Sequence, residues 1–246
     1  MIDYAVCCCQ GQRSYNEDRV GISTEQGDCA TFVLADGLGG HGMGDIASSL
    51  AVECSLSCAE DTGNKGNALL CDCFERAQSS ILKKQNELDA GQKMKTTMVL
   101  LRIEKNKAYF GYIGDSRLYH FSSRGWKRLT MDHSVPQLLV STGEIKESEI
   151  RHHPDRNKLL RVLGVEWETP RYSINPKPVP VKRGDGFLLC SDGFWEYILE
   201  EEMTGFYKKE QNAQHWLEKM KELVEKRGDA AQENADNFSA IAIRIV

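Results

Sequence analysis

The sequence lacks the features that mark membrane proteins and nucleic-acid-binding proteins. No apolar run approaches the roughly 20 residues that a membrane-spanning helix needs. The 31 Lys and Arg against 36 Asp and Glu leave a net charge of −5, and no basic face is concentrated along the chain. The first residues, MIDYAVCCCQ, contain neither a basic start nor a leader pattern. We therefore expect no nucleic-acid partner, no membrane association and a cytoplasmic location.

The sequence also lacks a zinc-binding cysteine pattern. None of its nine cysteines forms a Cys-x-x-Cys pair, and an odd number cannot all be joined in disulfides within one chain. Cys7, Cys8 and Cys9 fall in a strand-like segment, whereas Cys54 and Cys58 fall on an apolar helical stripe. We expect free thiols that are buried as small apolar side chains in a reducing compartment.

Strand-like and helical patterns come in separate blocks along the 246 residues. Apolar residues at helical spacing predict helices at 47–58, 70–81 and 213–224, the first with Asp45 as its N-cap. Segments rich in β-branched and aromatic residues predict strands at 3–9, 29–35, 96–104, 107–114, 117–122, 186–191 and 238–246. Runs of strands beside runs of helices favour an α+β architecture with antiparallel pairs over a βαβ alternation.

A glycine-rich loop follows the strand that ends at Asp36. The residues 37–42 satisfy the Gly-x-Gly-x-x-Gly pattern of dinucleotide-binding loops, which alone is a weak signal. A carboxylate at Asp36 would repel a pyrophosphate, and a second helix follows where a βαβ unit needs a strand. These two features argue against a phosphate-binding loop and against an oxidoreductase.

Four aspartates at the ends of apolar strands suggest a cation site instead. Asp36 and Asp192 are each followed by glycine after an apolar strand, Asp115 follows another, and Asp236 precedes one. Each Asp-Gly taken singly is also typical of a turn. Several carboxylates repel one another unless a cation joins them, and oxygen-only ligands favour Mg²⁺ or Mn²⁺. The flexible Gly37 could add its backbone carbonyl oxygen.

Eight short motifs, in order along nearly the whole chain, resemble the metal-dependent PPM-type, or type 2C, serine/threonine protein phosphatases, and the compact bacterial members most. They are RSYNED (13–18), ADGLGGHGMGDIAS (35–48), TTMV (96–99), IGDSRLY (113–119), DHS (132–134), HPDRNKLLRVLG (153–164), SDGFWE (191–196) and ADNFSAIAI (235–243). The resemblance implies a four-layer α-β-β-α sandwich of two packed antiparallel sheets flanked by helix pairs. It implies a single phosphatase domain over 1–246, with a flap subdomain at 143–172.

The resemblance also implies roles for individual residues. Asp36 would bridge two Mn²⁺ or Mg²⁺ ions with the Gly37 carbonyl on one of them, while Asp192 and Asp236 would hold the other. Asp115 with Asp192 would form a third site, and Glu17 and Asp18 would bind metal-bound waters. Arg13 would bind the substrate phosphate, because a guanidinium contacts two phosphate oxygens at once. A metal-bridged hydroxide would attack phosphorus directly, without a covalent intermediate.

The general acid is the point where the sequence departs from the animal relatives. Many of those have a histidine directly after the first Asp-Gly, and this chain has Leu38. His41 is one candidate for the acid, and a metal-bound water is the other. The expected flap contains a basic segment, formed by Arg151, His152, His153 and Arg156. This segment is either a solvated face or a surface that attracts phosphorylated protein segments.

The expected substrates are phosphorylated proteins, and the natural counterpart is a serine/threonine kinase. We expect a monomer. One alternative is a pseudophosphatase, a binding module of the same fold, but such modules usually lose metal ligands, and Asp36, Asp115, Asp192 and Asp236 are all present. Another alternative is the phosphatase branch that acts on regulators of sigma factors. That branch typically lacks the Arg13 motif, which is intact in this chain.

Overall fold

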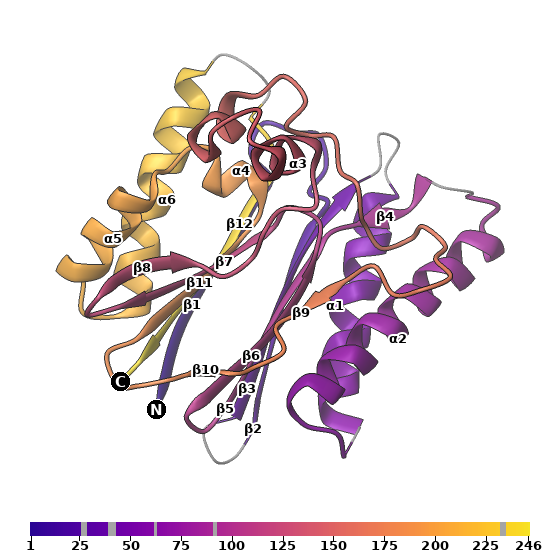
Figure 1. Cartoon of the computed structure of the whole chain (residues 1–246), viewed down its shortest axis with the longest axis horizontal. Helices are drawn as coiled ribbons and strands as arrows, with labels where there is room; N and C mark the ends of the chain where they lie inside the picture. The colour runs from indigo at the N-terminus through magenta and orange to yellow at the C-terminus, as the bar shows by residue number, and fades with distance from the viewer. Residues whose placement is uncertain (26–28, 39–42, 62, 91–92, 232–234) are drawn as a thin grey trace.

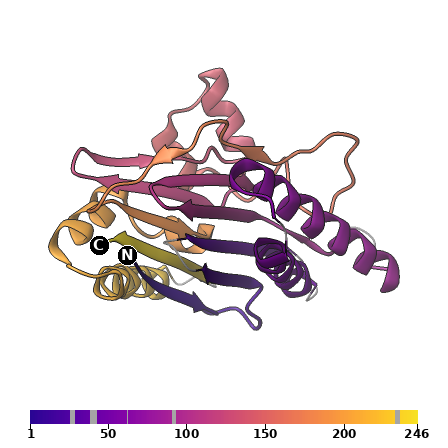
Figure 2. The ribbon, with the colours of Figure 1, turned by 90° about the horizontal axis from the view of Figure 1, so that it is seen from below.

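The computed structural model describes residues 1–25, 29–38, 43–61, 63–90, 93–231 and 235–246. Two antiparallel sheets lie face to face, and a pair of helices covers the outer face of each (Figure 1). The view from below shows the strands of both sheets between the two groups of helices (Figure 2). The four-layer α-β-β-α sandwich that the sequence predicted is confirmed.

The first sheet joins the two ends of the described chain, because its N-terminal strand pairs with its C-terminal strand. Its order is β1 (Ile2–Cys9), β12 (Phe238–Ile245), β11 (Gly186–Cys190), β7 (Arg117–Ser122) and β8 (Gly125–Arg128). The second sheet runs β10 (Val179–Pro180), β6 (Lys107–Ile113), β5 (Met98–Glu104), β3 (Cys29–Leu38) and β2 (Asp18–Glu25), with β4 (Lys95–Thr96) on β3 and β9 (Ser173–Ile174) on β6. Figure 1 shows α1 (Gly44–Asp61) and α2 (Gly66–Glu87) against the second sheet, and α5 (Glu200–Lys209) and α6 (Ala213–Ala230) against the first.

The central strands are apolar on both faces because each face meets a different layer. In β3, Phe32 and Leu34 pack between the sheets, while Val33 and Ala35 pack against α1 and α2. Successive strand residues point to opposite faces, so a run without polar positions is what this sandwich requires. The same alternation holds in β11 and β12.

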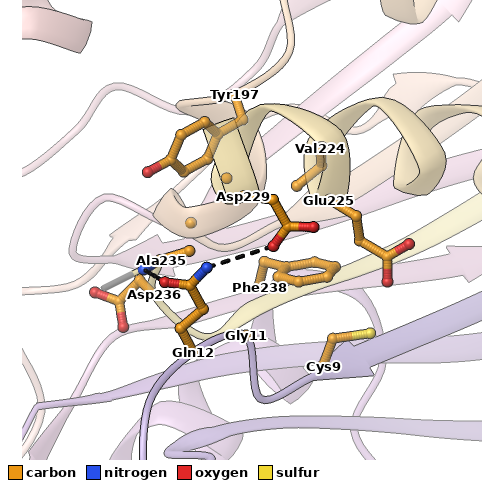
Figure 3. Close-up of a pocket in the computed structure, with 12 residues that line it drawn as sticks. Cys9, Gly11, Gln12, Tyr197, Val224, Glu225, Asp229, Ala235, Asp236 and Phe238 are labelled. Atoms are coloured by element: carbon orange, nitrogen blue, oxygen red, sulfur yellow. Dashed lines mark hydrogen bonds between the residues drawn. The ribbon is translucent and has the colours of Figure 1, made fainter. Parts of the chain in front are cut away.

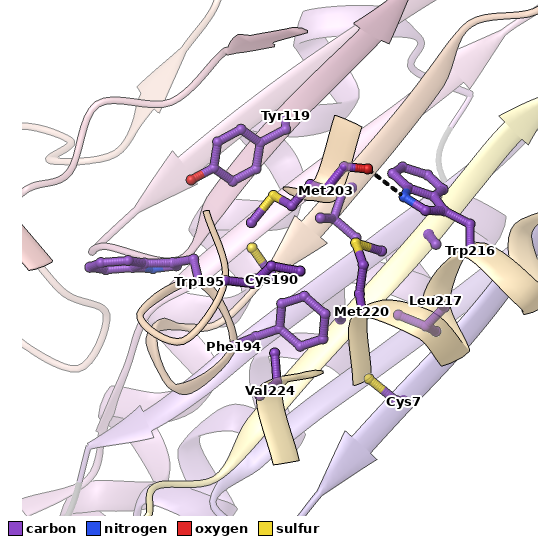
Figure 4. Packing of buried hydrophobic residues seen from close by; sticks show 14 of the residues in the cluster. Cys7, Tyr119, Cys190, Phe194, Trp195, Met203, Trp216, Leu217, Met220 and Val224 are labelled. Carbon is purple, nitrogen blue, oxygen red and sulfur yellow. Dashed lines mark hydrogen bonds between the residues drawn. The ribbon is translucent and has the colours of Figure 1, made fainter. Parts of the chain in front are cut away.

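The layer between the first sheet and its helices is built around large aromatic side chains (Figure 4). Trp216 of α6 is fully buried, and its indole N–H donates a hydrogen bond to the Met203 carbonyl oxygen at 3.1 Å. The sheet side of this layer carries small residues such as Cys7 and Ala240, which let α6 approach closely. Burial of one such aromatic side chain stabilises the fold by about 2–3 kcal/mol.

The structure corrects two local predictions. Asp45 lies inside the first turn of α1, which begins at Gly44, so its prediction as N-cap is wrong. The sequence patterns also missed β2, because DRVGISTE carries charge and glycine and is only partly buried along an edge of the second sheet. Among the described residues, no helix is long and apolar enough to cross a membrane.

The expected flap lies near one end of the sandwich. The helices α3 (Val135–Thr142), η2 (Glu147–His152) and α4 (Asp192–Trp195) belong to this region of the molecule (Figure 1). Within the range 143–172, the structure forms η2, isolated β-bridges at Leu159 and Leu163, and otherwise turns and irregular backbone. The flap as a subdomain stays a prediction.

Candidate active site

The acidic residues that the sequence singled out come together at the ends of strands from both sheets. Asp36 lies near the end of β3, Asp115 follows β6, Asp192 follows β11 and Asp236 precedes β12. A cavity of about 210 Å³ lies among them. Its lining residues are Arg13, Glu17, Asp36, Gly37, Leu38, Asp115, Asn157, Leu159, Asp192, Asp236 and Asn237.

Of the predicted site residues that the structure describes, Asp18 lies outside this lining. Asp18 is 1% exposed and stands directly opposite Asp36 in the β2–β3 ladder, so it lies behind the cavity wall. His41 lies outside the residues that the structure describes. Leu38 lines the cavity at the place where the resemblance gives many relatives a histidine.

Burial and neighbouring charges raise the pKa of three carboxyl groups in the cavity, those of Asp36, Asp115 and Asp192. Burial and the charge of Asp192 hold the pKa of Asp36 well above its usual value, and the same two causes act on the pKa of Asp115. Burial and Asp236 raise the pKa of Asp192. Such shifts mean that the ionised forms are destabilised where they stand, and a bound cation would relieve this. The donor set therefore fits a hard divalent ion.

The carboxylates are nevertheless not arranged around an ion as they stand. Among the described residues, no three acidic, histidine or cysteine side chains converge closely enough to hold one metal. Asp236 Oδ2 instead accepts a hydrogen bond from Arg13 Nη2 at 2.7 Å, and Asp192 Oδ1 accepts one from the Gly193 amide at 2.6 Å. These two carboxylates are thus held by protein partners within the acidic cavity.

Asp18 connects the two sheets beneath the cavity. Its Oδ2 accepts a hydrogen bond from Ser191 Oγ at 2.9 Å, and Ser191 Oγ in turn accepts one from the Ser239 amide at 2.9 Å. Burial raises the pKa of Asp18 to about 7. The residue is therefore tied to the segments that carry Asp192 and Asp236 while it pairs with the Asp36 strand.

The backbone of Asp36 is held by two threonines of the TTMV motif. Its amide donates to Thr97 Oγ1 at 3.0 Å, and its carbonyl oxygen accepts from Thr96 Oγ1 at 2.9 Å and from the Thr97 amide at 2.8 Å. The sequence motif supports the family resemblance but does not by itself indicate a role for its threonines. Both threonines are buried, and their hydroxyl groups find partners at Asp36.

Two glycines allow α1 to begin against the cavity. A Cβ on Gly37 would lie 2.3 Å from the Gly44 carbonyl oxygen, and one on Gly44 would lie 2.7 Å from the Gly37 carbonyl carbon. The Gly44 amide donates to Glu17 Oε1 at 3.2 Å. Glu17 therefore faces the first turn of α1, where the helix dipole favours a carboxylate.

Asn237 joins the start of β12 to three residues of the N-terminal loop, a role that the sequence patterns do not indicate. Its Oδ1 accepts from the Glu17 amide at 2.8 Å, and its Nδ2 donates to the carbonyl oxygens of Gln10 and Tyr15 at 2.7 and 2.9 Å. The side chain thereby fixes the N-terminal loop, which carries Arg13, against the start of β12. The position of Asn237 directly after Asp236 is the only hint in the sequence. Its hydrogen-bond partners lie more than 200 residues away along the chain, so local patterns cannot identify them.

Part of the expected basic flap is used in ion pairs. Arg156 Nε lies 2.7 Å from Glu196 Oε1, and Arg151 Nη2 lies 2.6 Å from Glu200 Oε1. Burial raises the pKa of Glu196 to about 7, with Asp192 as the next cause. The two arginines hold the flap segment against α4 and the start of α5, and this places Asn157 in the cavity lining.

Comparison with known proteins identifies this architecture. The family model described as protein phosphatase 2C matches residues 9–236. A serine/threonine phosphatase of Listeria welshimeri, stp, is 33% identical over 205 residues, covering 81% of this chain and 80% of its own. The protein phosphatase PhpP of Streptococcus pneumoniae is 30% identical over 198 residues, covering 78% of each chain.

Solved structures show the same fold. The serine/threonine phosphatase PstP of Mycobacterium tuberculosis is 27% identical, with a TM-score of 0.84 over 99% of this chain and 98% of that one. The catalytic domain of a PstP phosphatase, 26% identical with a TM-score of 0.83 over 100% of this chain and 98% of that one, was solved in complex with two manganese ions. The fold and the acidic cavity define a phosphatase of the PPM type. The chain belongs to the protein phosphatase 2C family, and the prediction of a serine/threonine protein phosphatase is confirmed.

Proposed function

We propose that the protein hydrolyses phosphoserine and phosphothreonine in other proteins with the help of Mn²⁺ or Mg²⁺. One observation carries the proposal: Asp36, Asp115, Asp192, Asp236 and Arg13 line a single cavity. Asp36, the Gly37 carbonyl, Asp192 and Asp236 would hold two ions, and Asp115 with Asp192 a third. When bound, such ions lower the pKa of a coordinated water and neutralise charge on the phosphoryl oxygens.

The chain's own residues supply binding and order. Arg13 is about half exposed at the cavity, so its guanidinium can exchange Asp236 for two oxygens of a phosphate dianion. Asn237 and the two threonines beside Asp36 hold the backbone at Glu17 and Asp36, which keeps these side chains at the cavity. Glu17, which lines the cavity, would accept a hydrogen bond from a coordinated water, and the same role for Asp18, behind the cavity wall, stays a prediction.

The mechanism requires no cysteine or serine nucleophile in the cavity. Cys190 is fully buried and burial raises its pKa, and no cysteine lines the described part of the cavity. Direct attack of a water molecule on phosphorus is consistent with a cavity whose described lining contains no cysteine or serine. Leaving-group protonation by His41 or by a coordinated water stays an open prediction.

The experiment that tests the proposal is hydrolysis of a phosphothreonine peptide by the purified protein with and without Mn²⁺. We expect activity with Mn²⁺, its loss in excess EDTA, and its loss in Asp36→Asn at saturating metal. Full activity in EDTA would contradict the metal mechanism. A Lys219→Gln variant, changed on the exposed face of α6, is the matched control and should keep the wild-type rate.

We further propose that the substrates are products of a serine/threonine kinase in the cytoplasm and that the protein acts as a monomer. All nine cysteines are free thiols, as a reducing compartment allows. Comparing the phosphoproteomes of cells that carry wild type or Asp192→Asn would identify the substrates. Unchanged phosphorylation of every protein would contradict the proposed role.

A further inference from the structure

A second cavity, of about 280 Å³, lies directly beside the active site (Figure 3). It is enclosed by the end of β1, the last turns of α6 and the segment before β12. Asp236 lines both this cavity and the acidic one. Phe238 and Val224 give it an apolar wall, while Glu225 and Asp229 add carboxylates (Figure 3). This volume is close to the lower end for small-molecule sites in proteins.

A cysteine pair lies at the β1 side of this second cavity. Cys9 is half-buried and lines the cavity, whereas Cys7, on the same face of β1, is buried beneath α6. The Cys9 sulfur interacts with the Cys7 thiol and with the Lys221 ammonium of α6. These contacts lower the pKa of Cys9 to about 6, although burial and Glu225 oppose them. Cys9 therefore has a lower pKa than an ordinary thiol, and it is accessible from the cavity.

The loop at Gly11 and Gln12, which lines the second cavity, is tightly packed against the segment before β12. Gly11 has φ of +60°, and a Cβ there would lie 2.2 Å from the Asp236 carbonyl oxygen. The Gln12 amide donates to the Ala235 carbonyl oxygen at 3.0 Å. Because Arg13 continues this loop and pairs with Asp236, a group that pushes on the loop from the second cavity moves both residues.

We propose that Cys9 is a modification site for low-molecular-weight disulfides, and that the adduct in the second cavity lowers phosphatase activity by displacing Asp236 and Arg13. The Cys9 thiolate attacks one sulfur of the disulfide, a bond forms between these two sulfurs, and the original sulfur–sulfur bond breaks. The released half leaves as a thiolate and takes a proton from water. The Cys9 sulfur is oxidised and the leaving sulfur is reduced, so no further oxidant is needed.

The test uses the full chain loaded with Mn²⁺ and the small uncharged probe bis(2-hydroxyethyl) disulfide. Peptide mass mapping should find the first adduct on Cys9. Activity at limiting Mn²⁺ should fall by about tenfold to 100-fold, as a displacement near 1 Å at reacting groups produces. Dithiothreitol should restore it. The mass readout does not depend on activity, so failure of the proposed metal mechanism would leave it intact.

Three variants make the result specific. Cys9→Ser should keep its basal activity and resist the probe, whereas Cys29→Ser, changed at the start of β3 far from Asp36 along that strand, should respond like wild type. Lys221→Met should keep basal activity and acquire the adduct several-fold more slowly, because the Cys9 thiolate loses the stabilising charge of the Lys221 ammonium. An adduct that forms no faster on Cys9 than on other cysteines would overturn the site. A complete Cys9 adduct with unchanged activity and unchanged Mn²⁺ affinity would overturn the coupling.

Discussion

Arg13 and Asp236, 223 positions apart in the sequence, form an ion pair of 2.7 Å between Nη2 and Oδ2 at the edge of the acidic cavity. The residue expected to bind phosphate thus holds a residue expected to bind metal. Both side chains are more than 40% exposed, so this pair adds little to stability. The pair matters for function, because a bound metal ion would take Asp236 away from Arg13 and a bound phosphate would take Arg13 away from Asp236.

Replacing Arg13 separates these two effects. We expect Arg13→Ala to lower kcat/KM for a phosphothreonine peptide by about 100-fold, as the loss of one preorganised donor to a charged phosphoryl group does. Mn²⁺ affinity should stay equal or rise, because Asp236 loses a competing cation. Peptide kinetics and Mn²⁺ titration by calorimetry measure the two quantities. Unchanged kinetics would show that Arg13 does not contact the substrate.

The Asp192 carboxylate should stabilise the Mn²⁺-bound protein and destabilise the metal-free protein. It is half-buried and lines the cavity with Asp36, Asp115 and Asp236, and its pKa is raised by desolvation and by Asp236. We expect Asp192→Asn to raise the free energy of unfolding in EDTA by about 1–3 kcal/mol and to remove the stabilisation by Mn²⁺. Thermal unfolding with and without Mn²⁺ gives both values. A lower melting temperature of the variant in EDTA would contradict the repulsion.

Asn237 should matter for both stability and turnover. Asn237→Ala leaves the Glu17 amide and the carbonyl oxygens of Gln10 and Tyr15 without their partner. We expect a loss of about 1–3 kcal/mol in unfolding free energy and a fall in kcat/KM as Arg13 loses its fixed position. Gln214→Ala, on the exposed face of α6, serves as a control with an unchanged rate. Equal kinetics for the two variants would argue against a positioning role.

His133 should make stability depend on pH. Its ring is stacked on Tyr112 with centroids 5.0 Å apart, and Nδ1 accepts a hydrogen bond from the Gly114 amide at 3.2 Å. Burial, with Arg161 as the next cause, lowers its pKa from 6.5 to about 4. The folded state therefore binds fewer protons than the unfolded state, and this contribution is complete above pH 6.5 and is lost as the pH falls towards 4.

The comparison of wild type with His133→Gln measures this contribution. Urea unfolding between pH 4 and 7 should show a difference between the two proteins that is largest near neutral pH and shrinks as the pH falls. A difference that is constant with pH would mean that His133 is not held neutral by its surroundings.

Local sequence patterns predicted most of the elements, because buried strands and amphipathic helices each have a period that short windows reveal. They failed where tertiary context decides. The strand β2 was missed because its stability comes from pairing with β3 and packing under α1, not from its own propensity. Asp45 was misplaced as an N-cap because the beginning of α1 is set by the close approach of Gly44 to Gly37.

By itself the sequence determined the family, the antiparallel α+β sandwich and the presence of carboxylates at the strand ends, since these depend on residue type and on order along the chain. Only the tertiary structure decided which groups meet: Asp18 opposite Asp36, Asn237 against the N-terminal loop, and Cys9 in a cavity that shares Asp236 with the active site. Such meetings depend on ångström distances between residues far apart in the chain, and these follow from how the two sheets and their helices pack.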